Sequence, residues 1–167
     1  MSDSGTFKFF LDSGSPEATL GMAKALGKML RAGDVLALEG GLGGGKTLFV
    51  RGLALGLGTK RPKDVRSPTF SLIQEHSGKI PLCHADLYRL KSGETLHLGL
   101  EEYWEKAGPE NPRWVTAIEW ADRAERLIPK TALRIKFEIL SPRERRIHFS
   151  GRSGWKKIKG LWKKRSF

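Results

Sequence analysis

Hydrophobic residues recur along the chain at two spacings, one typical of strands and one typical of helices. Compact apolar runs bounded by turn residues predict strands. These runs lie at residues 7–11, 35–38, 70–76, 80–86, 114–120, 132–140 and 145–150. A turn at Ser77 and Gly78 separates the third run from the fourth, which predicts an antiparallel hairpin.

Apolar residues at helical spacing predict two helices early in the chain. Ser15 as a cap and Pro16 at the first position predict the start of one helix, which should end near residues 31–33. The second helix covers residues 48–57, and residues 94–103 are weakly helical. Strands mixed with helices predict a single α/β layered domain whose sheet has parallel and antiparallel members.

Length and composition agree with one domain in a reducing compartment. The chain has 167 residues, which suits a single domain, and its one cysteine, Cys83, cannot form an internal disulfide. The apolar stretch at the N-terminus is too short for a signal peptide, and no run approaches the roughly 18 apolar residues of a membrane span. We therefore expect a soluble cytoplasmic protein without a membrane span.

Positive charge is concentrated near the C-terminus. The net charge is +12, of which residues 141–167 carry +9. We expect a domain over residues 1–150 and a basic amphipathic tail over residues 151–167, where tryptophans and aliphatic residues alternate with lysines. Such a tail could bind tRNA phosphates, an anionic membrane surface or an acidic groove, or it could pack its apolar face on the domain.

A glycine-rich segment carries the clearest chemical pattern. Residues 40–47, GGLGGGKT, match the phosphate-binding pattern G-x-x-x-x-G-K-[ST] between a predicted strand and a predicted helix. Loop amides would point at phosphate oxygens, Lys46 would reach the β and γ phosphates, and the Thr47 hydroxyl would bind Mg²⁺. The alternative, a flexible turn with a chance lysine, leaves the flanking strand and helix unexplained.

A magnesium site also needs a carboxylate, and two acids follow apolar strands. Asp86 and Glu119 could both lie at carboxyl ends of strands, where open α/β sheets bind ligands. The alternative role for each is a cap or turn residue. Thr69 is a candidate for sensing the γ phosphate, or else a turn residue after Pro68.

Several short motifs downstream of the glycine loop occur together in a recognisable order. They are SPTF at residues 67–70, HADLYRL at 84–90, LGLEEYW at 98–104 and IEW at 118–120. With the loop, they resemble the TsaE family of small bacterial P-loop ATPases of tRNA threonylcarbamoyladenosine biosynthesis. The resemblance covers residues 15–150, and five motifs in order are far more specific than any one of them.

The resemblance implies a single α/β P-loop domain that binds ATP and Mg²⁺, hydrolyses ATP slowly alone, and acts with TsaB and TsaD on tRNA. It makes Thr69 the switch threonine, and it assigns metal binding and water orientation to Asp86 and Glu119. His84 and Tyr88, on either side of Asp86, would support that acid or simply pack. The nucleotide contacts it implies are Gly40, Gly43, Gly44, Gly45, Lys46, Thr47, Leu48, Trp120 and Arg145. Trp120 could instead lie at the partner surface or close the core at the end of its strand.

The chain departs from the family pattern at three places. Gly41 stands where the family usually has an acid, and residues 91–95 hold a single acid, Glu94, where the family segment is usually rich in acids. The tail from Arg152 onward has no firm counterpart. Two other functions stay open. A kinase could use Arg143, Arg145 and Arg146 in a mobile lid, and an RNA-binding module could act through the basic tail alone.

Overall fold

The computed structural model describes residues 5–91, 94, 98–105 and 114–162 and shows one mixed, seven-stranded sheet. The strands are β1 (Thr6–Ser13), β2 (Val35–Gly40), β3 (Ile73–His76), β4 (Leu82–Asp86), β5 (Val115–Glu119), β6 (Leu133–Ile139) and β7 (Arg145–Arg152). The helices are α1 (Pro16–Gly27) and α2 (Lys46–Gly56), and short 3-10 helices are η1 (Pro62–Asp64), η3 (Leu100–Tyr103), η4 (Ala121–Ala124) and η5 (Ser153–Leu161). Their order in the sheet is β1-β7-β6-β2-β5-β4-β3.

The centre of the sheet is parallel and both edges are antiparallel. Strand β2 pairs in parallel with β5 and β6, and β5 pairs in parallel with β4. At the edges β3 pairs antiparallel with β4, while β7 lies antiparallel between β6 and β1. The predicted α/β domain with a mixed sheet is therefore confirmed, as is the hairpin. The parallel strands β2, β4 and β5 run in the same direction, so their carboxyl ends lie side by side at the same end of the sheet.

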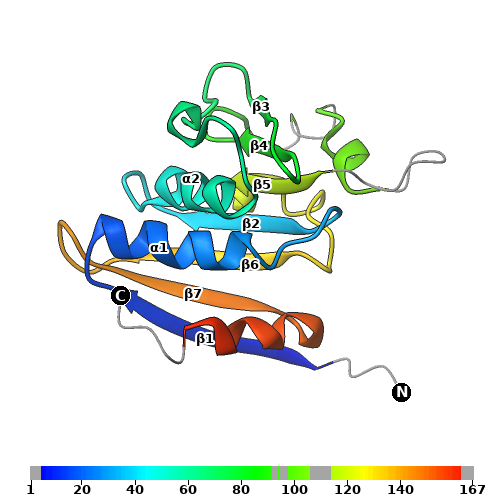
Figure 1. The fold of residues 1–167 in the computed structure, drawn as a ribbon. Helices are drawn as coiled ribbons and strands as arrows, with labels where there is room; N and C mark the ends of the chain where they lie inside the picture. The colour runs from blue at the N-terminus through cyan, green and yellow to red at the C-terminus, as the bar shows by residue number, and fades with distance from the viewer. Residues whose placement is uncertain (1–4, 92–93, 95–97, 106–113, 163–167) are drawn as a thin grey trace.

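Two apolar layers cover the sheet. Helices α1 and α2 and the segment η5 lie on one face (Figure 1) and bury the larger core, which includes Leu26, Phe49, Leu53 and Ile158. The other face of β2, β4 and β5 packs against the segments around η3 and η4. All five residues of β4 and of β5 are buried, so both faces of these strands are covered.

Helix α1 begins where the sequence predicts and ends earlier. The Ser15 hydroxyl accepts a hydrogen bond from the Ala18 amide at 3.1 Å, and Pro16 occupies the first turn. The helix ends at Gly27, before the predicted end near residues 31–33, and the chain then turns into β2. Of the weakly helical residues 94–103, the structure forms η3 at the end, while 95–97 lie outside the described residues.

The basic segment after β7 forms a 3-10 helix that packs on the sheet. Side chains three residues apart line up in such a helix, so Trp155, Ile158 and Leu161 face the core in one row. Ile158 is fully buried, and Trp162, which follows the helix, packs with Phe9 and Phe149. The apolar side of the predicted tail thus contacts the domain. Within the part of the chain that the structure describes, no helix is long and apolar enough to cross a bilayer.

Candidate functional site

The glycine loop joins the end of β2 to the start of α2 and is built from backbone conformations that favour glycine. Gly40, Gly43 and Gly45 have φ angles of 135°, 72° and 100°. A Cβ atom on Gly40 would also lie 2.7 Å from the Phe137 carbonyl oxygen of β6. The loop therefore needs glycine for its shape as well as for access of a ligand to its amides.

The loop forms one wall of a cavity of about 420 Å³ at the carboxyl edge of the sheet. Ten of the residues predicted from the sequence line it, namely Gly43, Gly44, Gly45, Lys46, Thr47, Leu48, Thr69, Asp86, Glu119 and Trp120. Segments far apart in the chain therefore meet in one hollow. Leu42, Ser67 and Tyr88 complete the lining.

The two acids are neighbours in the sheet. Asp86 and Glu119 are the last residues of β4 and β5, and they face each other in the parallel register. The Thr47 hydroxyl donates a hydrogen bond to Glu119 Oε2 at 3.0 Å, which joins the start of α2 to the end of β5. A hydroxyl and two carboxylates thus lie beside the loop.

Each carboxylate is held by a different set of donors. His84 Nε2 donates to Glu119 Oε1 at 2.8 Å, and His84 is fully buried. Asp86 accepts hydrogen bonds from the hydroxyls of Ser67 and Thr69, the latter at 3.1 Å, and from the Tyr88 amide at 2.9 Å. His84 therefore supports Glu119, whereas the sequence left open whether it supports Asp86 or simply packs.

Lys46 is held inside the site. Its Nζ atom donates to the carbonyl oxygens of Gly40 and Gly41 at 2.7 and 2.9 Å, and lies 4.0 Å from the centroid of the Trp120 ring. Burial lowers the pKa of Lys46, and the nearby carboxylates of Glu119 and Asp86 oppose that shift. The ammonium group is therefore bound by backbone carbonyls of its own loop.

Trp120 is placed by an uncommon backbone conformation. Its φ angle is +57°, which bulky residues rarely adopt and which is concentrated at functional sites. The ring packs against Tyr88 with centroids 4.9 Å apart, and the Arg123 guanidinium lies 5.4 Å from each centroid. Both rings line the cavity.

Gly40 and Arg145 lie outside the cavity lining but contact the loop. Arg145 Nη2 and Nε donate to the carbonyl oxygens of Gly43 and Gly44 at 2.9 and 3.1 Å. Arg145 thereby ties the start of β7 to the loop. The other two arginines of the alternative lid, Arg143 and Arg146, pair with Glu17 and Asp12, so all three contact the body of the domain.

The donor set suits Mg²⁺ in the way that nucleotide sites use it. Hydroxyl and carboxylate oxygens are the ligands that Mg²⁺ prefers, usually one or two carboxylates together with phosphate oxygens of a substrate. Among the described residues, no three His, Cys, Asp or Glu side chains gather as a self-sufficient metal site. Thr47, Glu119 and Asp86 therefore fit a metal that arrives with a nucleotide.

Comparison with known proteins gives a consistent result. Residues 13–147 match the family model described as threonylcarbamoyl adenosine biosynthesis protein TsaE. The chain belongs to the TsaE family. The protein described as tRNA threonylcarbamoyladenosine biosynthesis protein TsaE from Bacillus subtilis is 42% identical over 81% of each chain. The protein of that description from a Nostoc species is 51% identical, and the match spans 64% of either chain, just under two thirds of the relative's length.

A solved structure agrees with this family. The crystal structure of Bacillus subtilis YdiB superposes with a TM-score of 0.73 at 31% identity, covering 94% of this chain and 95% of that one. The TsaE match ends at residue 147, so η5 and Trp155 lie beyond it.

Two features of this TsaE site were not assigned from the sequence. Ser67 lies in the SPTF motif, yet its bond to Asp86 depends on how the loop before β3 folds back. The contact from His84 to Glu119 depends on β4 pairing with β5, which local spacing does not reveal. At Gly41, the departure from the family's usual acid, an added Cβ would meet no atom within 4 Å, so the loop has room for a side chain.

Proposed function

We propose that this member of the TsaE family binds ATP with Mg²⁺ and hydrolyses it in support of tRNA threonylcarbamoyladenosine biosynthesis, acting with TsaB and TsaD. The observation that carries the proposal is the hydrogen bond from Thr47 to Glu119, which lies beside Asp86 and next to the glycine loop. A phosphate chain on the loop amides would end at these oxygens. The cytoplasm is the compartment we propose, since Cys83 is a buried free thiol.

Each group has a role in this proposal. The loop amides and Lys46 would bind the phosphate oxygens, for which Lys46 would exchange its bonds to the Gly40 and Gly41 carbonyls for bonds to phosphate. Thr47 and Glu119 would hold Mg²⁺, which neutralises charge on the β and γ phosphates when bound. Asp86, held together with Thr69, would orient the attacking water.

Trp120 and Arg145 would act on the shape of the site. The Trp120 ring lies 4.0 Å from the Lys46 ammonium, so it limits where that charge can move and excludes water from one side. Arg145 donates to two loop carbonyls, which would hold the loop in one conformation. Both contributions depend on position and electrostatics and involve no covalent step, as is usual in phosphoryl transfer.

ATP turnover by the purified protein tests the proposal. We expect Lys46→Ala to lower turnover about 100-fold or more, because one charged phosphate contact is lost. Lys63→Ala, a change at an exposed lysine in η1, is the matched control and should leave turnover unchanged. Equal turnover in Lys46→Ala and the control would contradict the proposal.

The partners are tested separately. Addition of TsaB and TsaD should raise turnover of the unaltered protein and leave Lys46→Ala inactive. If the purified protein hydrolyses ATP and neither partner changes its turnover, the proposed ATP hydrolysis is supported and the proposed partnership is wrong. Phosphate transfer to a metabolite in preference to water would instead favour a kinase.

A further inference from the structure

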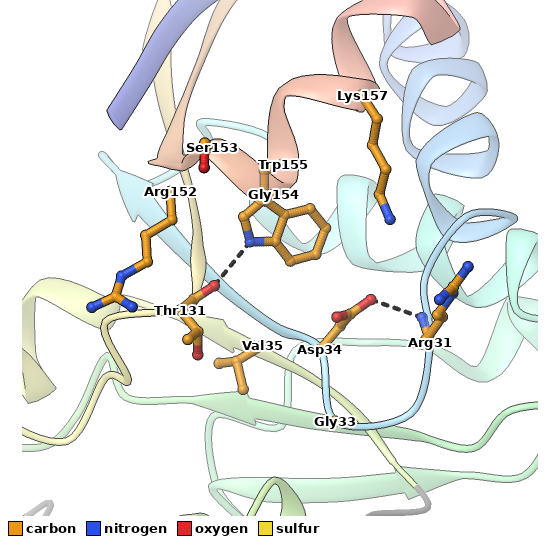
Figure 2. A pocket seen from close by; sticks show the side chains of 10 residues that line it. All are labelled: Arg31, Gly33, Asp34, Val35, Thr131, Arg152, Ser153, Gly154, Trp155 and Lys157. Atoms are coloured by element: carbon orange, nitrogen blue, oxygen red, sulfur yellow. Dashed lines mark hydrogen bonds between the residues drawn. The ribbon is translucent and has the colours of Figure 1, made fainter. Parts of the chain in front are cut away.

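A second cavity lies at the opposite end of the central strand β2 (Figure 2). It has a volume of about 550 Å³ and is lined from the start of β2, the end of β7 and the beginning of η5. Strand β2 runs from Val35 to Gly40, so this cavity is about 16 Å along the strand from the glycine loop at a rise of about 3.3 Å per residue. The two hollows are therefore separate.

The cavity is built around one tryptophan ring. Trp155 Nε1 donates to the Thr131 carbonyl at 2.9 Å, which fixes the orientation of the half-buried indole. A Cβ atom on Gly151 would lie 3.2 Å from Trp155 Cδ1, so glycine lets the ring pack closely on β7. The ring is thus an oriented aromatic surface at the edge of a hollow.

Three cationic side chains belong to the lining of this cavity. Arg31, Arg152 and Lys157 line the cavity, and Figure 2 shows the indole between Arg152 on one side and Lys157 on the other. None of the three side chains makes a hydrogen bond or ion pair with another residue in the described part of the chain. Their donors remain available to an anion.

One carboxylate lies among these cations. Asp34 Oδ2 accepts a hydrogen bond from the Arg31 amide at 2.8 Å, so this acid is fixed at the cavity wall. Burial raises the pKa of Asp34, and the charges of Lys157 and Arg31 oppose the shift. A ligand that is anionic throughout would be repelled here, whereas one with an N–H group at this point would be accepted.

We propose that this cavity binds one nucleotide of single-stranded RNA, with its base on Trp155, its base edge at Asp34 and its phosphates at Arg152 and Lys157. Aromatic rings stack on bases of any sequence, arginine and lysine bind phosphates, and carboxylates accept hydrogen bonds from amino groups of bases. An acidic peptide would satisfy the cations but would place further carboxylates against Asp34.

This site does not depend on ATP hydrolysis at the glycine loop. The family to which the chain belongs takes part in the biosynthesis of a modified tRNA nucleoside, so RNA is a class of ligand that fits this role. The site would hold RNA at one end of the sheet while nucleotide chemistry takes place at the other end.

Binding of a fluorescein-labelled single-stranded RNA of about 12 nucleotides, a length in the range of such sites, tests the proposal by fluorescence anisotropy with the full chain. We expect Arg152→Glu and Lys157→Glu each to weaken binding about tenfold and to reduce the slope of log affinity against log salt by about 0.7 per lost phosphate contact. Lys159→Glu is the matched control, since it makes the same charge change on the same helix outside the cavity.

The control decides between a site and general attraction. If Lys159→Glu weakens binding as much as Lys157→Glu, the tail attracts RNA only through its charge and the proposed site is wrong. Binding of poly-glutamate that is as tight as binding of RNA would also overturn the proposal, because it would identify an acidic protein segment as the ligand.

The ring and the carboxylate have their own tests. Trp155→Leu should weaken binding about tenfold, while Trp155→Phe, which retains an aromatic face, should stay within about threefold. An oligomer of cytidine should bind more tightly than one of uridine, and Asp34→Ala should remove that preference. Equal affinities of Trp155→Leu and Trp155→Phe at unchanged melting temperature would exclude stacking.

Failure of the two proposals can be told apart. Lys46→Ala lies in the glycine loop and should bind RNA with unchanged affinity. Arg152→Glu and Lys157→Glu should hydrolyse ATP at the rate of the unaltered protein. An Arg152→Glu variant that loses both activities would mean that the cavity is not an independent site.

Discussion

At the residue scale, the site depends on side chains that contact other side chains in place of solvent. Glu119 is 3% exposed, and its two oxygens are bound by His84 and Thr47. A buried carboxylate without such donors would have unpaired oxygens and no fixed orientation. The position of Glu119 therefore depends on a histidine that does not line the cavity.

His84 is expected to act as a positioning residue for Glu119. We expect His84→Leu to lower the kcat for ATP about 10–100-fold, the range seen for residues that orient metal ligands. His84→Gln should recover part of the loss, since its amide can donate to Glu119. Nucleotide affinity without Mg²⁺, measured by calorimetry, should be unchanged, and a kcat of His84→Leu within twofold of normal would contradict this role.

The buried His76 side chain should make the free energy of unfolding depend on pH. It is 6% exposed, and its Nε2 atom has no hydrogen-bond partner among the described residues. Burial lowers the pKa of His76, so the unfolded chain, with a histidine pKa of about 6.5, binds the proton first. The free energy of unfolding should therefore fall as pH drops below about 6.5.

Urea unfolding at pH 7 and pH 5.5 measures this effect. His76→Gln should show a smaller loss of stability between these two conditions than the unaltered protein. His148→Gln, at a half-exposed histidine of β7, is the comparison variant, and His76→Gln should change the pH response more than it does. An unaltered pH response in His76→Gln would show that other groups cause the acid sensitivity.

At the element scale, helices α1 and α2 approach each other through glycines. A Cβ atom on Gly52 would lie 2.6 Å from the Leu20 carbonyl oxygen, and one on Gly27 would lie 2.5 Å from the Leu53 carbonyl oxygen. Backbone atoms cannot move aside as side chains can. The close approach keeps α2, and therefore Lys46 and Thr47 at its start, in a fixed position.

Gly52→Ala should accordingly destabilise the fold. Alanine favours a helix over glycine by about 1 kcal/mol, but overpacking against a backbone costs about 1–3 kcal/mol, so we expect a net loss of stability. Gly160→Ala, where no atom lies within 4 Å, is the control and should be neutral or slightly stabilising. Guanidinium unfolding measures both, and a stabilised Gly52→Ala would contradict the packing argument.

The sequence predicted the individual strands, helices and loops better than it predicted which of them contact one another. Local patterns locate the Ser15 cap and the glycine loop because capping and phosphate binding need particular residues at fixed offsets. The order of strands across the sheet depends on contacts between distant segments. For that reason the bonds from Arg145 to the loop carbonyls were not anticipated, although the residue itself was a candidate.

At the scale of the whole molecule, the last described segment completes the core. Ile158 is fully buried and Trp162 is 5% exposed, and both belong to the core that contains Phe7 of β1. Lys156, Lys157 and Lys159, on either side of Ile158, are exposed. One short segment thus supplies apolar packing on one side and positive charge on the other.

Ile158→Ala should lower the free energy of unfolding by about 2–5 kcal/mol, the range for removing a large buried aliphatic side chain. Lys159→Ala, next to it on the same segment, should change stability by no more than about 0.5 kcal/mol. Thermal or urea unfolding distinguishes the two. Equal and small effects would show that η5 is only loosely attached.

The pairing of β1 with β7 also has a consequence for synthesis of the chain. Thr6 lies opposite Arg152 in the register, and β7 is the only strand beside β1 in the described sheet. The ribosome must therefore make the chain as far as residue 152 before β1 is fully paired in the sheet. Until then Phe7 and Phe9 remain uncovered, so we expect assembly to be slow and to require protection of the nascent segment by chaperones.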